Sequence, residues 1–244
     1  MAVIIYLSVP LIFLLILVLT CSYLCFHFFA ETLTVAIALS FFVYGFRRRG
    51  EGAFFSIVGV GFLSVGILDA FHLLAYKGMG IFPVVEENVA TQFWIAARFA
   101  QAVTLLFAVL LSGRKIRTGG AAAISAAYAA GVTAAIFSGY FPDAFVAPGG
   151  LTYFKIYSEY IIIGILIFVT INSYRLKSVF DYKEQEFLSV AFALAILSEF
   201  SFTLYNDVYG IMNFVGHILK TASYILICFI FIPVLCNKLV DKQK

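Results

Sequence analysis

The stretch AFFSIVGVGFLSVGILDAFHLLAYKGMG, residues 53–80, decides the fold class because it joins a long apolar run to a polar end. An α-helix rises about 1.5 Å per residue, so roughly 20 apolar residues cross the hydrocarbon core of a bilayer. Residues 53–76 meet that length and are predicted to span a membrane. Near the end of this run the chain nevertheless places an aspartate, a histidine and a lysine: Asp69, His72 and Lys77.

The composition of the whole chain extends this prediction. Of its 244 residues, 63% are hydrophobic and only 12% are charged, which is far from the average of soluble domains. The chain also lacks the alternating ten-residue segments of a membrane β-barrel. We therefore predict an all-α polytopic transmembrane helical bundle in the lipid bilayer, with residues 1–244 forming a single integral membrane domain and no nucleic-acid partner. About eight spans are expected, near residues 2–25, 27–46, 53–76, 91–112, 120–140, 152–174, 185–206 and 211–236.

Lysine and arginine set the predicted orientation, because they are retained on the cytoplasmic side of short loops. Twelve of the sixteen basic residues follow the second, fourth, sixth and eighth spans. Both termini are therefore predicted to be cytoplasmic, whereas VVEENVA (84–90) and YFPDAFVAPGG (140–150) are predicted to face outside. The twelve basic residues are Arg47, Arg48, Arg49, Arg114, Lys115, Arg117, Arg175, Lys177, Lys183, Lys238, Lys242 and Lys244.

The ionisable residues inside the spans are predicted to form one layer in the outer half of the membrane. Asp69 lies about 10 Å inside the outer end of its span, with Glu31 slightly shallower and Lys220 slightly deeper. A charge near the bilayer centre costs at least a few kcal/mol, so such groups turn inward and pair or line a cavity. The layer therefore predicts a binding pocket. Its candidate ligand-binding residues are His27, Glu31, Asp69, His72, Lys77, Gln92, Trp94, Arg98, Glu159, Glu199, Asp207, His217 and Lys220.

Helical spacing gives several of these side chains a shared face. Residues three or four apart are neighbours on a helix surface, as in the sequence pairs His27/Glu31, Asp69/His72, Lys155/Glu159 and His217/Lys220. A structural explanation remains open, in which Asp69 pairs with Arg98, or Glu199 with Lys220, only to fix helix register. Lys77, at the water boundary, is expected to extend its ammonium toward water or to order a loop.

Several strings resemble the signature of the third class of membrane-associated sensor (MASE) domains. They are LDAFHLLAYKGMG (68–80), NVATQFWIAARF (88–99), FHFFAE (26–31) and LYNDVYGIMNFVGHILKTASYILI (204–227). The resemblance implies a sensory input module in a bacterial or archaeal cell membrane, coupled to a cytoplasmic PAS, histidine kinase or diguanylate cyclase output domain. Because no output unit precedes Lys244, that domain is expected in cis in a longer chain or in trans, and a homodimer is expected by the same analogy.

Three histidines suggest what the pocket holds. His27, His72 and His217 all fall in the outer layer beside carboxylates, and neutral imidazole is the commonest protein metal ligand. Asp69 or Glu31 could be a further ligand, or could orient one of the imidazole rings through a hydrogen bond. Three histidines with a carboxylate could bind zinc, iron or copper. Haem held between His72 and His217 is a second option.

A third option is a small polar or anionic ligand held by Arg98, Lys155 and Lys220. Protein classes other than a sensor also follow from these residues. An intramembrane metal-dependent hydrolase that uses the histidine and aspartate cluster is the main alternative function. A transporter would need polar groups in the inner half, where the sequence places almost none. A sensor without catalytic activity of its own therefore fits the one-sided layer best.

Overall fold

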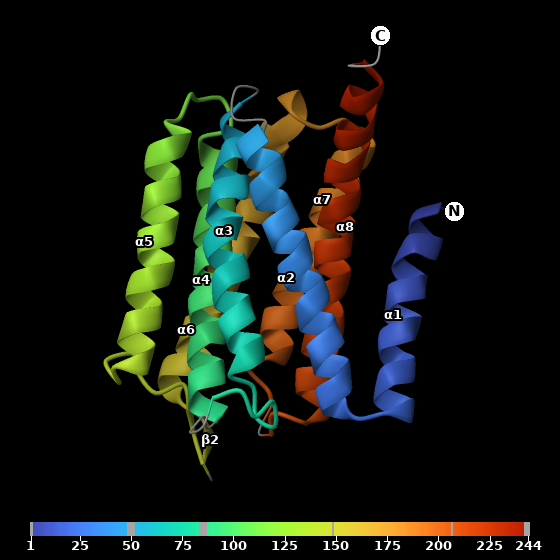
Figure 1. Cartoon of the computed structure of the whole chain (residues 1–244). Coiled ribbons are helices and arrows are strands. Elements are labelled where there is room, and N and C mark those ends of the chain that lie inside the picture. The colour runs from blue at the N-terminus through green and yellow to red at the C-terminus, as the bar shows by residue number, and fades with distance from the viewer. Residues whose placement is uncertain (1, 48–51, 83–86, 148, 206, 242–244) are drawn as a thin grey trace.

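A computed structural model describes residues 2–47, 52–82, 87–147, 149–205 and 207–241, with side chains between residues 8 and 230 apart from residue 18. The α-helices of these ranges run alternately in opposite directions and form one bundle (Figure 1). The elements are α1 (Ala2–Thr20), α2 (Tyr23–Arg47), α3 (Ala53–Leu74), α4 (Glu87–Leu110), α5 (Thr118–Phe137), β1 (Phe145–Val146), β2 (Gly150–Leu151), α6 (Tyr153–Asn172), the 3-10 helix η1 (Ser173–Ser178), α7 (Tyr182–Ser201) and α8 (Ile211–Asp241).

The prediction of an all-helical membrane bundle is confirmed. Six helices are long and apolar enough to cross a membrane, namely α2 to α6 and α8. Among the described residues, α1 provides the shorter apolar segment Ser8–Leu17, and α7 begins with the polar sequence YKEQE. The count of eight spans therefore stays a prediction.

Local capping moves several helix boundaries away from their predicted positions. The span predicted over 185–206 is the helix Tyr182–Ser201. It begins three residues earlier than predicted because the Asp181 side chain and Glu184 form a capping box at its first turn. The span predicted over 2–25 ends at Thr20. Ser22 then accepts a hydrogen bond from the Cys25 amide at 3.1 Å, and the second helix begins at Tyr23 rather than at residue 27.

The two ends of the bundle differ in charge. The end of α2 with Arg47, the connection between α4 and α5 with Lys115, and η1 with Arg175 lie at one end, and the antiparallel β1–β2 hairpin lies at the other (Figure 1). This is the alternation on which the predicted orientation depends, while the cytoplasmic location of the basic end stays a prediction. Arg48, Arg49, Val84, Val85, Glu86, Lys242, Lys244 and the side chain of Lys238 lie outside the described residues.

The buried core consists of two large apolar clusters, one toward each end of the bundle, and a small cluster beside α1. Along α4, the cluster nearer the hairpin extends to Ala97, Arg98 follows, and the cluster nearer the basic end begins at Ala102. The buried polar side chains thus lie between the two large clusters. An apolar groove of about 630 Å³ among α3, α4 and α5 has no acidic or basic lining residue, so it lies apart from this layer.

Two glycines allow α2 and α3 to pack closely. A Cβ atom added at Gly59 would lie 2.6 Å from the Gly45 Cα and 2.9 Å from the Phe41 carbonyl oxygen. Small residues let helices approach in this way within lipid, where van der Waals contact is a main source of helix association. The crossing holds the basic end of the two helices together.

Replacement of Gly59 by alanine is expected to lower the free energy of unfolding by about 1–3 kcal/mol, because the helix backbones must separate. Denaturant unfolding of the detergent-solubilised chain measures this change. Gly131→Ala is the matched control, since an added Cβ on α5 meets nothing within 4 Å. Equal stability of both variants would contradict the close crossing.

Candidate functional site

A layer of ionisable side chains crosses the bundle between the two large apolar clusters. Six helices contribute to it: α2, α3, α4, α6, α7 and α8. None of these side chains is more than 4% exposed. The members are His27, Glu31, Asp69, His72, Arg98, Lys155, Glu159, Glu199, His217 and Lys220.

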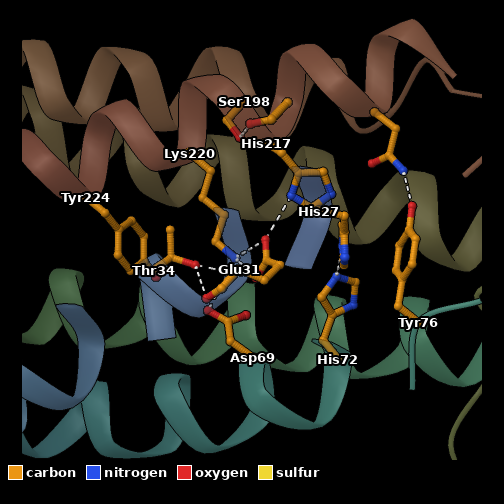
Figure 2. Close-up of polar contacts among 12 residues, drawn as sticks. His27, Glu31, Thr34, Asp69, His72, Tyr76, Ser198, His217, Lys220 and Tyr224 are labelled. Atoms are coloured by element: carbon orange, nitrogen blue, oxygen red, sulfur yellow. Dashed lines mark hydrogen bonds and ion pairs between the residues drawn. The ribbon is translucent and has the colours of Figure 1, made fainter. Parts of the chain in front are cut away.

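A network of ion pairs links four helices at the centre of this layer. The Lys220 ammonium of α8 donates to both carboxylate oxygens of Glu31 on α2, at 3.0 and 2.7 Å. The same ammonium lies 3.4 Å from the Asp69 carboxylate on α3. Arg98 on α4 donates to both Asp69 oxygens at 2.7 and 2.6 Å. Figure 2 shows Glu31, Lys220 and Asp69 converging, and these charge-assisted bonds fix the four helices relative to one another.

The network continues through polar side chains that the sequence analysis does not identify. Arg98 donates to Gln101, one turn along α4, and to the Tyr224 hydroxyl at 3.2 Å. The hydroxyl in turn donates to Gln101 Oε1 at 3.0 Å. The signal in the sequence is spacing, since Gln101 lies three residues after Arg98 and Tyr224 lies four residues after Lys220.

A second group of charges lies on α6 and α7. Lys155 donates to Glu159 Oε1 and to the Phe202 carbonyl oxygen, both at 2.6 Å. The Glu199 carboxyl group lies beside that of Glu159. The Trp94 indole donates to Glu159 at 3.1 Å, and its ring lies 4.5 Å from the Lys220 ammonium. Trp94 thus connects the two groups as a wall of the site.

The observed partners correct the sequence analysis. Of the two ion pairs considered as a structural explanation, the one between Asp69 and Arg98 forms, whereas the one between Glu199 and Lys220 does not. Lys220 instead binds Glu31, and the two side chains meet at one level although Glu31 is predicted to be shallower. Glu31 reaches Lys220 because α2 packs against both α3 and α8. Its carboxylate therefore lies between the side chains of these two helices.

Every basic side chain of the layer already has a carboxylate partner. Three cations, Arg98, Lys155 and Lys220, face four carboxyl groups, those of Glu31, Asp69, Glu159 and Glu199. Each cation binds one of these carboxylates. An additional anion would thus be buried without an unpaired basic side chain to bind it. The layer is therefore better suited to a cation than to an anionic ligand.

The three histidines meet beside the Glu31 carboxylate. His27 Nε2 lies 3.3 Å from His72 Nε2, and His217 Nδ1 lies 2.8 Å from Glu31 Oε1. His72 Nδ1 is 2.8 Å from the Ala90 carbonyl oxygen. One potential metal-ligating atom from each histidine and one from Glu31 all lie within 4.8 Å of one another. The predicted metal set contains Asp69, whereas the geometry brings Glu31 to the histidines and leaves Asp69 with Arg98 and Lys220.

A small cavity connects two of these histidines with the loop that follows α3. Its volume is about 20 Å³, enough for about one water molecule, and its lining includes His72, His217, Lys77 and Glu87. Lys77 is 52% exposed and binds Glu87 at 2.5 Å, which agrees with its expected role in ordering a loop. This hydrogen bond and the Glu87 charge raise the pKa of the Lys77 ammonium above its ordinary value.

Two predicted site residues lie away from the histidines. The Gln92 amide donates to the carbonyl oxygens of Phe141 and Pro142, both at 3.0 Å, and so holds the loop before the hairpin. Asp207 is exposed and accepts a hydrogen bond from the Tyr209 amide at 3.0 Å. Their contacts are with loop backbone.

The helices and the buried layer define a polytopic membrane protein with a polar site confined to the half of the bundle next to the hairpin. A family model described as "Membrane-associated sensor domain" matches residues 18–233, which contain the whole network. The chain belongs to this family, MASE3. A search of curated proteins and a search of solved structures each found no match.

Replacement of Lys220 by methionine is expected to lower the free energy of unfolding by about 3–5 kcal/mol, because Glu31 loses its buried counter-ion. Detergent-based unfolding followed by Trp94 fluorescence measures the change. Lys77→Met removes the exposed lysine and is expected to leave the midpoint unchanged. Similar midpoints for both variants would show that the buried network does not hold the helices together.

The purified chain is expected to show no Soret band. Pockets for small organic molecules usually measure about 300–1,000 Å³, and the cavity beside His72 and His217 measures about 20 Å³. An absorption spectrum after expression with added haem tests this expectation. A Soret band that disappears in His72→Ala would show that the bundle opens to admit the porphyrin.

Proposed function

We propose that this sensor domain detects a stimulus at the buried layer and transmits it through α8 to a cytoplasmic signalling output. A histidine kinase or a diguanylate cyclase, attached directly or through a PAS domain, is the proposed output, in cis or in trans. Any catalytic activity then resides in that output. Membership in a family of membrane-associated sensor domains supports the sensory part of this proposal.

The contact between Lys220 and its two carboxylate partners is the observation that carries the proposal. It joins α8 to α2 through Glu31 and to α3 through Asp69. A buried ion that loses one partner is strongly destabilised, so it moves toward another partner or draws one in. Two arrangements of Lys220, nearer to Glu31 or nearer to Asp69, would therefore be separated by a displacement of α8.

The length of α8 supports transmission over a distance. The helix runs from Ile211 to Asp241, and the part beyond Lys220 extends about 30 Å along the helix axis. A continuous helix carries a shift or rotation at its buried end to its far end. A stimulus produces such a shift only if it binds the two arrangements with different affinity.

The alternative function as an intramembrane hydrolase has less support. It requires a lipid-like substrate to reach a metal-bound water, and the cavity beside the histidines has room for about one water molecule. A sensor of an ion or a proton needs no larger space. The proposed cytoplasmic output also agrees with the orientation predicted from the basic loops.

Fusion of the chain to a diguanylate cyclase or kinase reporter in a bacterial membrane tests the proposal. Glu31→Gln and Lys220→Met are expected to change the reporter output by about fivefold or more, the lower end of typical allosteric coupling. The double variant should resemble one of the single variants, because both substitutions break the same contact.

The control for this experiment is Lys77→Met, which breaks only the exposed pair with Glu87. Its output should equal that of the unmodified fusion at matched amounts of membrane-inserted protein. The proposal fails if Glu31→Gln, Lys220→Met and Arg98→Gln all insert normally and all leave the reporter output unchanged.

A further inference from the structure

We propose that His27, His72 and His217, together with Glu31, bind one divalent transition-metal ion of the zinc type. The inference rests on the proposed sensory function, whose stimulus it identifies, but binding itself is measurable without any output. Three imidazole nitrogens and one carboxylate oxygen are a common donor set for zinc, and related ions such as Co²⁺ take the same ligands.

The distance between His27 and His72 fits coordination of a shared ion. Zinc–nitrogen distances are about 2.0–2.1 Å, so two nitrogens of a tetrahedral site lie about 3.3–3.4 Å apart. The observed separation of the two Nε2 atoms is 3.3 Å. Their rings come from α2 and α3, and the Tyr76 ring stacks on His27 with centroids 3.5 Å apart, which limits the movement of that imidazole.

A hydrogen bond fixes the tautomer of His72. The Ala90 carbonyl oxygen can only accept, so His72 Nδ1 carries the hydrogen and Nε2 keeps its lone pair. A backbone carbonyl bound to the second ring nitrogen is a usual partner of a metal-ligating histidine. His217 Nδ1 and Glu31 Oε1 lie 2.8 Å apart, so an ion that both atoms bind takes the place of their hydrogen bond.

Glu31 connects the histidines to the ion-pair network. Its carboxylate binds both His217 and Lys220, so an ion that binds Glu31 competes with the Lys220 ammonium. Lys220 then depends more on Asp69, which is 3.4 Å away. Because the four donor atoms lie within 4.8 Å of one another, the set must contract around a bound ion, and this contraction draws α2, α3 and α8 together.

The surroundings of the histidines suit a cation better than an anion and lie close to a loop. Each basic side chain of the layer already binds a carboxylate, so an added anion would meet no unpaired basic side chain there. The small cavity lined by His72 and His217 also reaches Glu87, whose carboxylate is partly exposed next to Lys77. We expect an ion to reach the histidines from this side.

Cobalt binding to the purified full chain tests the assignment. The chain is treated with a chelator and then titrated with Co²⁺, which gives visible absorption bands in a tetrahedral site, and the bound Co²⁺ is afterwards displaced with Zn²⁺. One ion per chain is expected. Glu31→Gln, His27→Gln and His72→Gln should each weaken Co²⁺ binding about 100-fold or more. Removal of a residue that only hydrogen-bonds a metal ligand weakens binding about 10- to 100-fold, and loss of a ligand itself should cost at least as much.

Glu184→Gln is the control, because Glu184 is a carboxylate of the capping box at the start of α7 and lies outside both the layer and the histidine set. It should retain the affinity of the unmodified chain. The assignment is overturned if the unmodified chain binds no Co²⁺ or Zn²⁺, or if a histidine variant that is monodisperse and helical binds as tightly as Glu184→Gln.

The two proposals can fail separately. If no metal binds but Glu31→Gln still changes the reporter output, the sensory role of the network stands and the metal is wrong. If the ion binds and the reporter does not respond to Zn²⁺ or to the variants, the metal site stands and the proposed transmission through α8 is wrong.

Discussion

The scarcity of water inside the bundle is the constraint on which the rest of the structure depends. A charge within an apolar bundle is tolerated only with a partner, so each buried carboxylate or ammonium of the central network requires a side chain from a neighbouring helix. Lys220 meets this requirement through Glu31 and Asp69, and Asp69 meets it through Arg98. The positions of α2, α3, α4 and α8 are therefore coupled by charge in addition to apolar packing.

This coupling explains why the polar layer is suited to sensing. The apolar clusters on either side are close-packed by phenylalanine, leucine and isoleucine, and such packing resists gradual deformation. Ion pairs, by contrast, can exchange partners in discrete steps. Glu31 is the residue at which such an exchange has the widest effect, because its two oxygens serve a histidine and a lysine of α8 at once.

The histidines and the ion pairs form one site with two parts. The ion pairs hold the helices, while the histidines bring three imidazole rings beside the Glu31 carboxylate. Membership in a family of membrane-associated sensor domains gives this arrangement its biological setting. A ligand that acts on the histidines thus acts on the same carboxylate that positions α8.

The sequence by itself determined the fold class and the residues of the polar layer, because hydropathy and helical spacing depend only on neighbours along the chain. It predicted eight spans, and six helices of the described residues are long and apolar enough to cross a membrane. An ion pair of Asp69 with Arg98 was one of the structural alternatives that it left open, and this pair forms. Only the tertiary structure decided that Lys220 binds Glu31 rather than Glu199, and that Glu31 rather than Asp69 joins the three histidines. The physical reason is that the helical periodicity of the sequence gives the depth and the face of a side chain. It does not say which helix lies opposite that face, because the packing of the helices against one another decides this.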